Sequence, residues 1–441
     1  MLAALLPHVA TNCMSDTSAS SPTAPTDTAN DAAARPSLFD KCHQFFEPDG
    51  DYAKAKEADL YPYFRPIERN DGARAIMNGE EVVMAGSNNY LGLTSDPRVQ
   101  EAAAQSIKTY GTGCTGSRFL NGTLDLHLQL EERLADFMEA EACILYSTGY
   151  MTNLGVVQAI AGKGDMIFSD KDNHACIVAG TQMSYAETRR YRHNDLDHLE
   201  QMLERAHERH PDKGKLIATD GVFSMSGEIA DVPRLISLAR TYNAALMLDD
   251  AHAIGVIGPK GQGSASTYGR LQDVDLITGT FSKSFSSLGG FCVGDEDVIE
   301  YLRHESSPHI FSASMPPANV ATVLKCLDIL EEEPERLERL WEVSDYMREG
   351  FREQGFDVWD SETPIIPVVV GDMETCFRFW RDLLEEGVFV NAVVPPAVPK
   401  GQSLMRTSYM ATHTDEDLDR ILEAFYKVGT RHGVIGSNGV H

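Results

Sequence analysis

The amino-acid sequence predicts an α/β protein with a large, mostly parallel sheet domain and a smaller α+β domain at the C-terminal end. Between about residues 96 and 310, helical stretches alternate with short apolar runs, which is the pattern of parallel strands joined by crossover helices. These runs occupy residues 142–146, 166–168, 216–218, 245–248 and 275–278. Beyond the segment Ser312-Ala-Ser-Met-Pro-Pro317 the alternation stops, and the change of pattern indicates the second domain.

The chain divides into four parts by composition and pattern. Residues 1–37 are rich in Ser, Thr, Ala, Pro and Asp with almost nothing to bury, so we expect a disordered N-terminal tail. Residues 38–95 form a lead-in segment, residues 96–311 the large domain and residues 312–441 the small domain. The elements expected in the small domain are a charged helix at about 319–355, strand-like runs at 365–370 and 389–390, and a helix near 415–430.

Length, hydropathy and cysteine content favour a globular protein of the cytoplasm. A chain of 441 residues with a hydrophobic share of 42% can bury a sizeable core. No apolar run approaches the roughly 20 residues of a membrane helix, so we expect no integral membrane segment. The apolar start at residues 1–6 is short and has no Lys or Arg before it, unlike a secretory signal. The eight cysteines form no C-x-x-C pair and are expected to stay reduced.

The net charge of −28 excludes some classes of partner. Such a surface repels nucleic acid and anionic membranes, so we expect neither as a main partner. The acidic residues are spread along the chain, which suits ordinary solubility or adaptation to a salty cytoplasm where ions screen the repulsion.

A lysine and an aspartate follow two of the apolar runs. Lys283 stands in Gly279-Thr-Phe-Ser-Lys283, and Asp249 directly follows the run at 245–248. A carboxylate at the end of a buried strand is costly unless a cation meets it, and the protonated pyridine nitrogen of pyridoxal 5'-phosphate (PLP) is such a cation. Because both runs end at the edge where open α/β sheets bind ligands, we expect Lys283 to hold PLP as a Schiff base and Asp249 to pair with its ring nitrogen.

Other residues nearby suit the phosphate group of this cofactor. Gly149 and Tyr150 open a helix directly after a strand, where backbone N–H groups face a bound phosphate. Thr280 and Ser282 add hydroxyl groups on the loop that carries the lysine. These four residues are therefore candidates for the phosphate site.

Two histidines are candidates for contacts with the cofactor ring. His174 follows Asp172-Asn and is expected to stack on the pyridine, although an ordinary histidine at a helix start is the alternative interpretation. His252 lies three residues after Asp249 and can donate to the phenolic oxygen of the cofactor or to a substrate carbonyl.

Five motifs occur in an order and spacing that resemble the α-oxoamine synthase family of fold-type I PLP enzymes. They are Tyr146-Ser-Thr-Gly-Tyr150, Asp172-Asn-His174, Asp220-Gly-Val-Phe-Ser-Met225, Asp249-Asp-Ala-His252-Ala-Ile-Gly255 and Gly279-Thr-Phe-Ser-Lys283. The resemblance extends from about Ser87 to His413 and implies the fold of fold-type I PLP-dependent transferases. Residues 87–92 and 116–123 are most similar to the bacterial soluble serine palmitoyltransferase branch.

The resemblance also implies roles for individual residues. Lys283 is implied to act as acid and base for the α-proton of the substrate as well as to bind PLP. Asn89 and Arg406 are implied to receive the carboxylate of the amino acid, for which a guanidinium is well suited. Ser312 is implied to join the phosphate site of the other subunit, because active sites in this family lie at the interface of a homodimer. No metal is implied.

The reaction that the resemblance implies is a PLP-dependent decarboxylative condensation. L-Serine and palmitoyl-CoA would give a 3-oxo sphinganine-type amine, CoA and CO2, whereas other members of the family use glycine or alanine with other acyl-CoAs. An aminotransferase uses the same lysine and aspartate and remains an alternative. A catalytically inactive partner subunit is a further alternative, which the presence of Lys283 disfavours.

Two positions depart from some serine palmitoyltransferases. Val394 stands where some of them carry arginine, and Thr115 stands where some carry asparagine. L-Cysteate, which would give a sulfonolipid precursor, is the main competitor of serine. Its sulfonate would prefer a second cation beside Arg406, and the absence of an arginine at position 394 favours serine.

Overall fold

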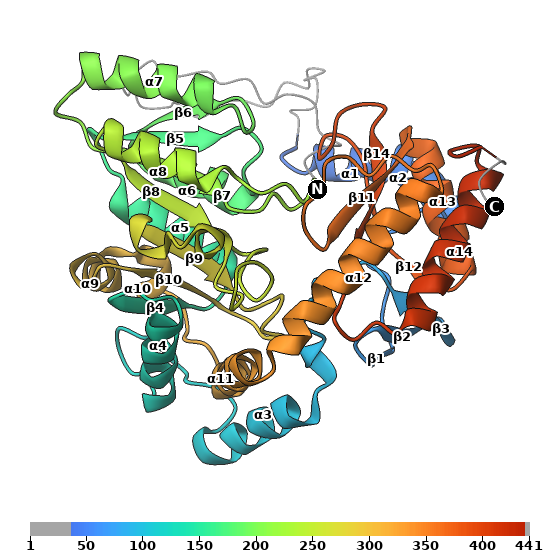
Figure 1. Ribbon diagram of the computed structural model, residues 1–441, viewed down its shortest axis with the longest axis horizontal. Helices are drawn as coiled ribbons and strands as arrows, with labels where there is room; N and C mark the ends of the chain where they lie inside the picture. Colours follow the sequence, from blue (N-terminus) through green and yellow to red (C-terminus); the bar gives the residue numbers. More distant parts are fainter. Residues whose placement is uncertain (1–36, 437–441) are drawn as a thin grey trace, which may run out of the picture.

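A seven-stranded sheet forms the centre of the larger domain in the computed structural model, which describes residues 37–436 (Figure 1). The strand order is β4-β10-β9-β8-β7-β5-β6, and every strand runs parallel to the others except β10, which is antiparallel to both neighbours. The bounds are β4 (Ala142–Tyr146), β5 (Met166–Asp170), β6 (Glu187–Tyr191), β7 (Lys215–Asp220), β8 (Ala245–Asp249), β9 (Leu276–Thr280) and β10 (Gly290–Gly294). The predicted α/β class with a mostly parallel sheet is confirmed.

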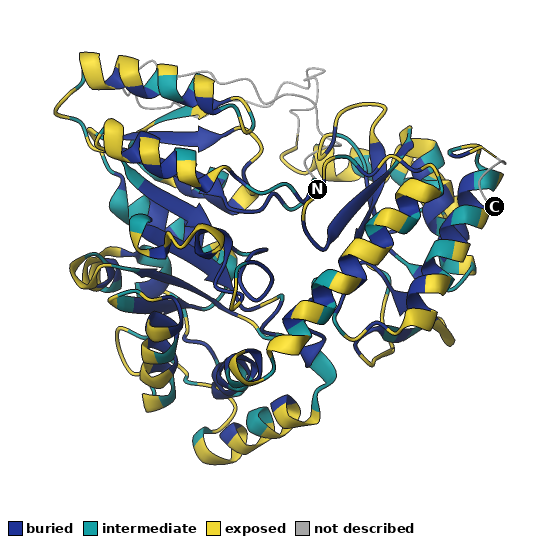
Figure 2. Cartoon of the chain, viewed as in Figure 1, coloured by how far each residue is buried: buried dark blue, intermediate teal, exposed yellow. Residues whose placement is uncertain are grey.

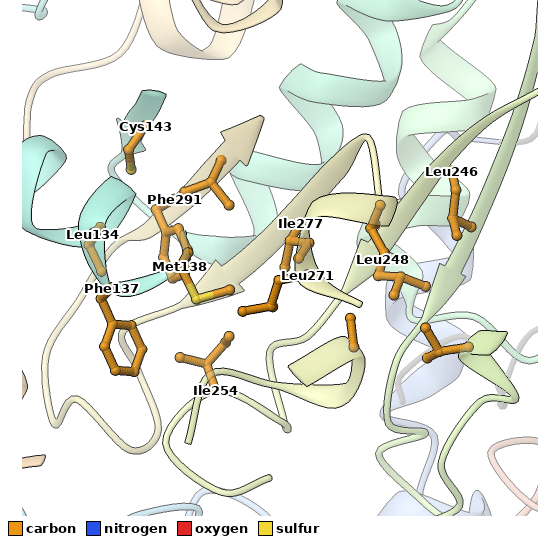
Figure 3. Close-up of a cluster of buried hydrophobic side chains, with 14 of the residues drawn as sticks. Leu134, Phe137, Met138, Cys143, Leu246, Leu248, Ile254, Leu271, Ile277 and Phe291 are labelled. Atoms are coloured by element: carbon orange, nitrogen blue, oxygen red, sulfur yellow. The ribbon is translucent and has the colours of Figure 1, made fainter. Parts of the chain in front are cut away.

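The central strands are apolar throughout because both faces of the sheet are covered. In β8, Leu246 and Leu248 enter one buried cluster, whereas Met247 enters the cluster on the opposite face. Figure 3 shows part of the first cluster, where Ile277 lies between Phe291 and Leu248, all three on strands of the sheet. A strand buried on both sides reads as a continuous apolar run, which is why the sequence pattern located β5, β7 and β8.

Helices cover both faces of this sheet. Those that contribute to the first cluster are α3 (Pro97–Tyr110), α4 (Asp125–Phe137), α7 (Leu196–Arg209), α8 (Val232–Thr241) and α11 (Pro317–Glu332). The opposite face carries α5 (Gly149–Ile160), α6 (Ala175–Met183) and α9 (Glu296–Glu305), followed by the short α10 (Ser307–Ile310). Three 3-10 turns, at Leu93–Ser95, Ser264–Tyr268 and Leu271–Asp273, complete the described elements of this part.

The smaller domain contains a three-stranded antiparallel sheet in the order β11-β14-β13. Its elements are α12 (Pro334–Glu353), β11 (Ile365–Gly371), α13 (Met373–Glu385), β12 (Val388–Phe389), β13 (Asn391–Val393), β14 (Ser403–Ser408) and α14 (Asp415–Arg431). Helices α12 and α14 each have one buried face and one exposed face, as expected of helices that cover a sheet on one side (Figure 2).

The lead-in segment pairs with this smaller domain. After α1 (Asp40–Phe45) and α2 (Asp51–Glu57), it forms β1 (Arg69–Asn70), β2 (Arg74–Met77) and β3 (Glu80–Met84). Strand β3 runs parallel to β12, which gives a four-stranded sheet in the order β1-β2-β3-β12. The predicted disordered tail lies outside the described residues except for Ser37.

The single long helix expected at about 319–355 is wrong, because the structure has two helices there. Helix α11 ends at Glu332 and α12 begins at Pro334. Proline lacks the N–H that would continue the helical ladder, and it disfavours helical geometry at the residue before it. Glu333 accordingly has φ −122° and ψ 66°, and Pro334 occupies the first turn of the new helix, where it is well tolerated.

Strands β6 and β10 were not located from the sequence. β6 lies at the edge of the sheet and reads Glu-Thr-Arg-Arg-Tyr, with only Tyr191 buried. β10 is short and bounded by two glycines. Among residues 37–436, no helix has the length and apolar character needed to cross a membrane, and the cysteines are free thiols.

Candidate active site

The carboxyl ends of the parallel strands meet at one edge of the sheet and line a pocket of about 280 Å³. Ligands of open α/β sheets bind at this edge because the loops that follow the strands converge there. The predicted site residues in the pocket wall are Gly149, Tyr150, His174, Asp249, His252, Thr280, Ser282 and Lys283. The fold therefore brings these residues together, whereas Asn89, Arg406 and Ser312 lie outside the wall.

Asp249 is held at the base of the pocket by a network of hydrogen bonds. Its side chain is 3% exposed, and Asn153 Nδ2 donates to its Oδ2 at 2.6 Å. The backbone N–H of Ala251 donates to Oδ1 at 3.0 Å. Asn153 is itself oriented by Thr278, whose hydroxyl donates to Asn153 Oδ1 at 2.8 Å. The carboxylate is thus fixed as a hydrogen-bond acceptor that lines the pocket.

His174 begins helix α6 and is fixed from behind. Its backbone N–H donates to Asp220 Oδ2 at 2.8 Å, and its Nδ1 lies 2.8 Å from Cys176 Sγ. Burial lowers the pKa of His174, which favours a neutral ring beside the pocket. Burial, reinforced by the nearby Asp249, raises the pKa of Asp220 well above its usual value.

His252 faces Tyr90 across the inner side of the pocket. Tyr90 Oη and His252 Nδ1 are 2.8 Å apart, and Tyr90 is fully buried. Burial lowers the pKa of His252 well below its usual value, with Lys283 and Arg406 acting in the same direction. A neutral imidazole keeps one donor and one acceptor nitrogen, so the nitrogen that does not face Tyr90 is available to a ligand.

Lys283 follows β9 and its side chain enters the pocket. Burial lowers the pKa of Lys283 to about 8, and the attraction of Asp249 opposes this shift only in part. A lysine with a lowered pKa has a larger neutral fraction near neutral pH, and the neutral amine is the form that attacks a carbonyl.

Groups that can bind a phosphate lie at the start of helix α5. Thr148 caps this helix through its Oγ1, which accepts from the Met151 N–H at 3.1 Å. Thr280 Oγ1 and Ser282 Oγ are 2.9 Å apart on the opposite side. A Cβ atom at Gly149 would lie 2.6 Å from Thr280 Oγ1, so only glycine allows this close approach.

This set of donors fits PLP. The N-terminus of α5 and two hydroxyl groups suit a phosphate dianion. Lys283 would supply the amine for the carbonyl carbon, and Asp249 would supply a carboxylate for the pyridine nitrogen. His174 and Ala251 lie in the same pocket wall and can flank a flat ring.

Arg406 lies in β14 and is buried beside the pocket. Its Nε donates to the Ser224 carbonyl at 2.6 Å, and its Nη2 donates to Asn88 Oδ1 at 3.0 Å. Asn89, the predicted neighbour, donates instead to Thr94 Oγ1 at 2.8 Å. The turn at 87–92 therefore presents Asn88, and not Asn89, to the arginine.

Ser312 does not reach the Lys283 pocket of its own chain. It lines a separate small cavity together with Arg118 and His127. The adjacent Ser314 N–H donates to the Gly116 carbonyl at 2.9 Å, which ties this segment to the turn at 111–116. Its expected contact with a phosphate therefore requires a second copy of the chain.

Four polar residues at the site were given no role from the sequence: Asn153, Asp220, Tyr90 and Asn88. Asn153 left a usable signal, because it lies in a mostly apolar helix and a buried amide needs partners. Asp220 left one too, because it ends an apolar strand just as Asp249 does. Tyr90 and Asn88 left none, since their partners are distant in the sequence.

Comparison with known proteins gives the class of the protein. The family model "aminotransferase class I and II" matches residues 80–425, so the chain belongs to that family. The chain is 48% identical over 373 residues to a serine palmitoyltransferase of Sphingobacterium spiritivorum, across 85% of this chain and 93% of the relative. It is 42% identical over 380 residues to an 8-amino-7-oxononanoate synthase of Symbiobacterium thermophilum, across 86% and 96%.

Solved structures agree with this assignment. A serine palmitoyltransferase of Sphingomonas wittichii superposes with a TM-score of 0.85 at 36% identity, over 91% of this chain and 100% of that chain. A high-resolution structure of SPT with its PLP internal aldimine gives a TM-score of 0.87 at 34% identity over the same shares. The protein is a PLP-dependent acyltransferase of fold type I, and the predicted resemblance and cofactor are confirmed.

We expect borohydride reduction of the PLP-loaded protein to attach PLP covalently to Lys283, because the amine with the lowered pKa lies opposite Asp249 in the pocket. Peptide mapping by mass spectrometry locates the label. Lys283→Ala should lose it, and Lys260→Ala, a change at an exposed lysine, should keep it. A label on any other lysine of the wild-type protein would contradict the assignment.

Proposed function

We propose that the protein condenses L-serine with a long-chain acyl-CoA, such as palmitoyl-CoA, to give a 3-oxo sphinganine-type amine, CoA and CO2. The observation that carries the proposal is the joint placement of Lys283 and Asp249 in one pocket, with the buried Arg406 beside it. The identity of 46–48% to four serine palmitoyltransferases supports the choice within the family. The 8-amino-7-oxononanoate synthases, at 41–43%, mark the nearest alternative among the relatives described.

The residues around Asp249 serve the cofactor. When bound, PLP supplies an electron sink for the electron pair left at the substrate Cα. Asp249, oriented by Asn153 and Ala251, would hold the proton on the ring nitrogen. His174 would stack on the ring, and His252, oriented by Tyr90, would donate to the phenolic oxygen.

Lys283 moves protons at the substrate. When the substrate is bound, the neutral amine of Lys283 would take the proton from Cα. After the acyl group has been joined to Cα and CO2 has left, the same Nζ would return a proton to that carbon. The lowered pKa of Lys283 suits both tasks near neutral pH.

Arg406 sets the geometry of the reacting carbon. Its Nε and one Nη2 hydrogen are engaged by Ser224 and Asn88, which leaves the remaining guanidinium donors to the substrate carboxylate. A carboxylate held by Arg406 would fix the orientation of the bonds at Cα relative to the cofactor, and that orientation would decide which bond is broken first.

Asp249→Asn should lower kcat by roughly a hundredfold or more, because the amide no longer holds the ring nitrogen protonated and carbanion stabilisation belongs to the transition state. Steady-state kinetics at saturating serine measure the effect. Asp250→Asn is the matched control, since Asp250 is buried next to it and bonds Ser264. An Asp249→Asn enzyme with kcat within about twofold of the wild type would exclude the assigned role.

We also propose a homodimer in which Ser312 completes the phosphate site of the partner subunit. Ser312→Asp should be inactive, because its carboxylate would repel the phosphate, and Lys283→Ala should be inactive by itself. After the two inactive variants exchange subunits, each mixed dimer has one intact site, so the mixture should regain about a quarter of the wild-type activity. An active Ser312→Asp homodimer, or a mixture that stays inactive after exchange, would refute the shared site.

The substrate assignment is tested by kcat/KM for L-serine and L-cysteate at fixed palmitoyl-CoA. We expect serine to be preferred, because a sulfonate beside a carboxylate needs a second cation and Val394 packs as an apolar residue in the small-domain core. Glycine and alanine serve as controls for the related synthases. A tenfold preference for cysteate, about 1.4 kcal/mol in the transition state, would overturn serine and leave the mechanism standing.

A further inference from the structure

His193 lies between two carboxylates at the start of the turn that follows β6. Its Nδ1 is 3.0 Å from Asp170 Oδ1, and its Nε2 is 3.2 Å from Glu228 Oε2. Ionised carboxylates only accept hydrogen bonds, and a neutral imidazole has a single N–H. Both contacts are satisfied together only by the imidazolium form.

One of the two carboxylates closes the turn that delivers His174. Asp170 ends β5 and is 1% exposed. Besides His193, it accepts from the Asp172 N–H through Oδ1 and from the Asn194 N–H through Oδ2, both at 2.8 Å. The turn at 170–174 therefore takes its shape from a carboxylate that His193 holds in place.

The other carboxylate belongs to the hairpin that supports Arg406. Val222 and Ile229 pair in this hairpin, and the Phe223 N–H donates to the Glu228 carbonyl at 3.0 Å. The ring of His193 packs edge-on against Phe223, with centroids 4.4 Å apart. On the same hairpin, the Ser224 carbonyl accepts the hydrogen bond of Arg406 Nε.

We propose that His193 is a positioning residue that joins the turn carrying His174 to the hairpin carrying Ser224, and so sets the cofactor ring relative to the arginine that receives the substrate carboxylate. The inference rests on the roles proposed above for His174 and Arg406. His193 itself lines no part of the pocket. It acts through two segments that do, since His174 and Ser224 both lie in the pocket wall.

The charge of His193 persists through neutral pH. Burial lowers its pKa, but the hydrogen bonds to Asp170 and Glu228 and the nearby Asp172 more than compensate and raise the pKa to about 10. Because this folded-state value exceeds the unfolded value of about 6.5, the stabilisation is complete below that pH and is lost as pH rises through about 10. Further charged residues near Glu228, across the adjoining cleft, are Arg352, Asp360 and Glu362.

The test begins with His193→Phe, which keeps a ring against Phe223 and removes both donors. We expect KM for the amino acid to rise by roughly tenfold and the Kd for PLP, measured by equilibrium dialysis, by roughly fivefold, with a smaller change in kcat. His198→Phe is the matched control, because His198 lies in the same corner and its Nδ1 accepts only from the Arg192 N–H. It should leave both constants within about twofold of the wild type.

A second variant, Glu228→Gln, keeps an acceptor and removes one charge. The pKa of His193, followed by NMR titration, should fall. Because loss of the His193 proton is expected to raise KM, KM should begin to rise at a lower pH in this variant than in the wild type. If His193→Phe does not fold, the Glu228→Gln variant tests the inference by itself. A folded His193→Phe with both constants unchanged, or a Glu228→Gln enzyme whose KM profile matches the wild type, would overturn the inference.

Failure of the proposed function gives a different result. The measurements use whichever amino acid the wild-type enzyme accepts, so a preference other than serine leaves the inference intact. If His174→Ala leaves the PLP Kd unchanged and Arg406→Ala leaves KM unchanged, the site assignments fail before the role of His193 is at issue.

Discussion

The buried carboxylate of Asp249 is the interaction on which the rest of the site depends. A charge at the end of a strand that is covered on both faces is stable only with donors on every side. Asn153 and Ala251 supply two of them, and the pocket face is left for a cation. The same burial lowers the pKa of His174 and His252, which favours neutral rings, and lowers the pKa of Lys283 to about 8, which enlarges its neutral fraction near neutral pH.

Three adjacent parallel strands end in buried aspartates, and each of these carboxylates has different partners. Asp220 and Asp249 are direct register partners on β7 and β8, and Asp170 ends the next strand, β5. Asp249 meets donors and the cofactor pocket, Asp170 meets the charged ring of His193, and Asp220 gains protonated character because its pKa is raised. Three carboxylates this close together would repel one another if all were ionised and unpaired. Their different partners relieve this repulsion in the folded state.

The sequence predicted those parts of the fold and site that depend on local pattern. Asp249 was singled out because it directly follows an apolar run, Lys283 because it lies in the short loop after another, and β8 was found because both of its faces are buried. The contact of Asn88 with Arg406 was not predicted, because the conformation of the turn decides which side chain meets Arg406, and Arg406 lies more than 300 positions away. The edge strand β6 was missed because polar side chains on its open side hide the pattern.

The proposed binding site for the substrate carboxylate is built from three separate parts of the chain. Arg406 comes from β14 of the smaller domain, Ser224 from a hairpin of the larger domain, and Asn88 from the lead-in segment. Strand β14 pairs with β11 and β13 and bridges to Gly86 of the lead-in segment, and the Arg406 hydrogen bond to Ser224 links it to the larger domain. The position of the guanidinium relative to the cofactor is therefore fixed by how the domains meet. Residues that stiffen the Ser224 hairpin are remote from the chemistry, but under the proposed role of Arg406 they would help to decide which bond at Cα breaks.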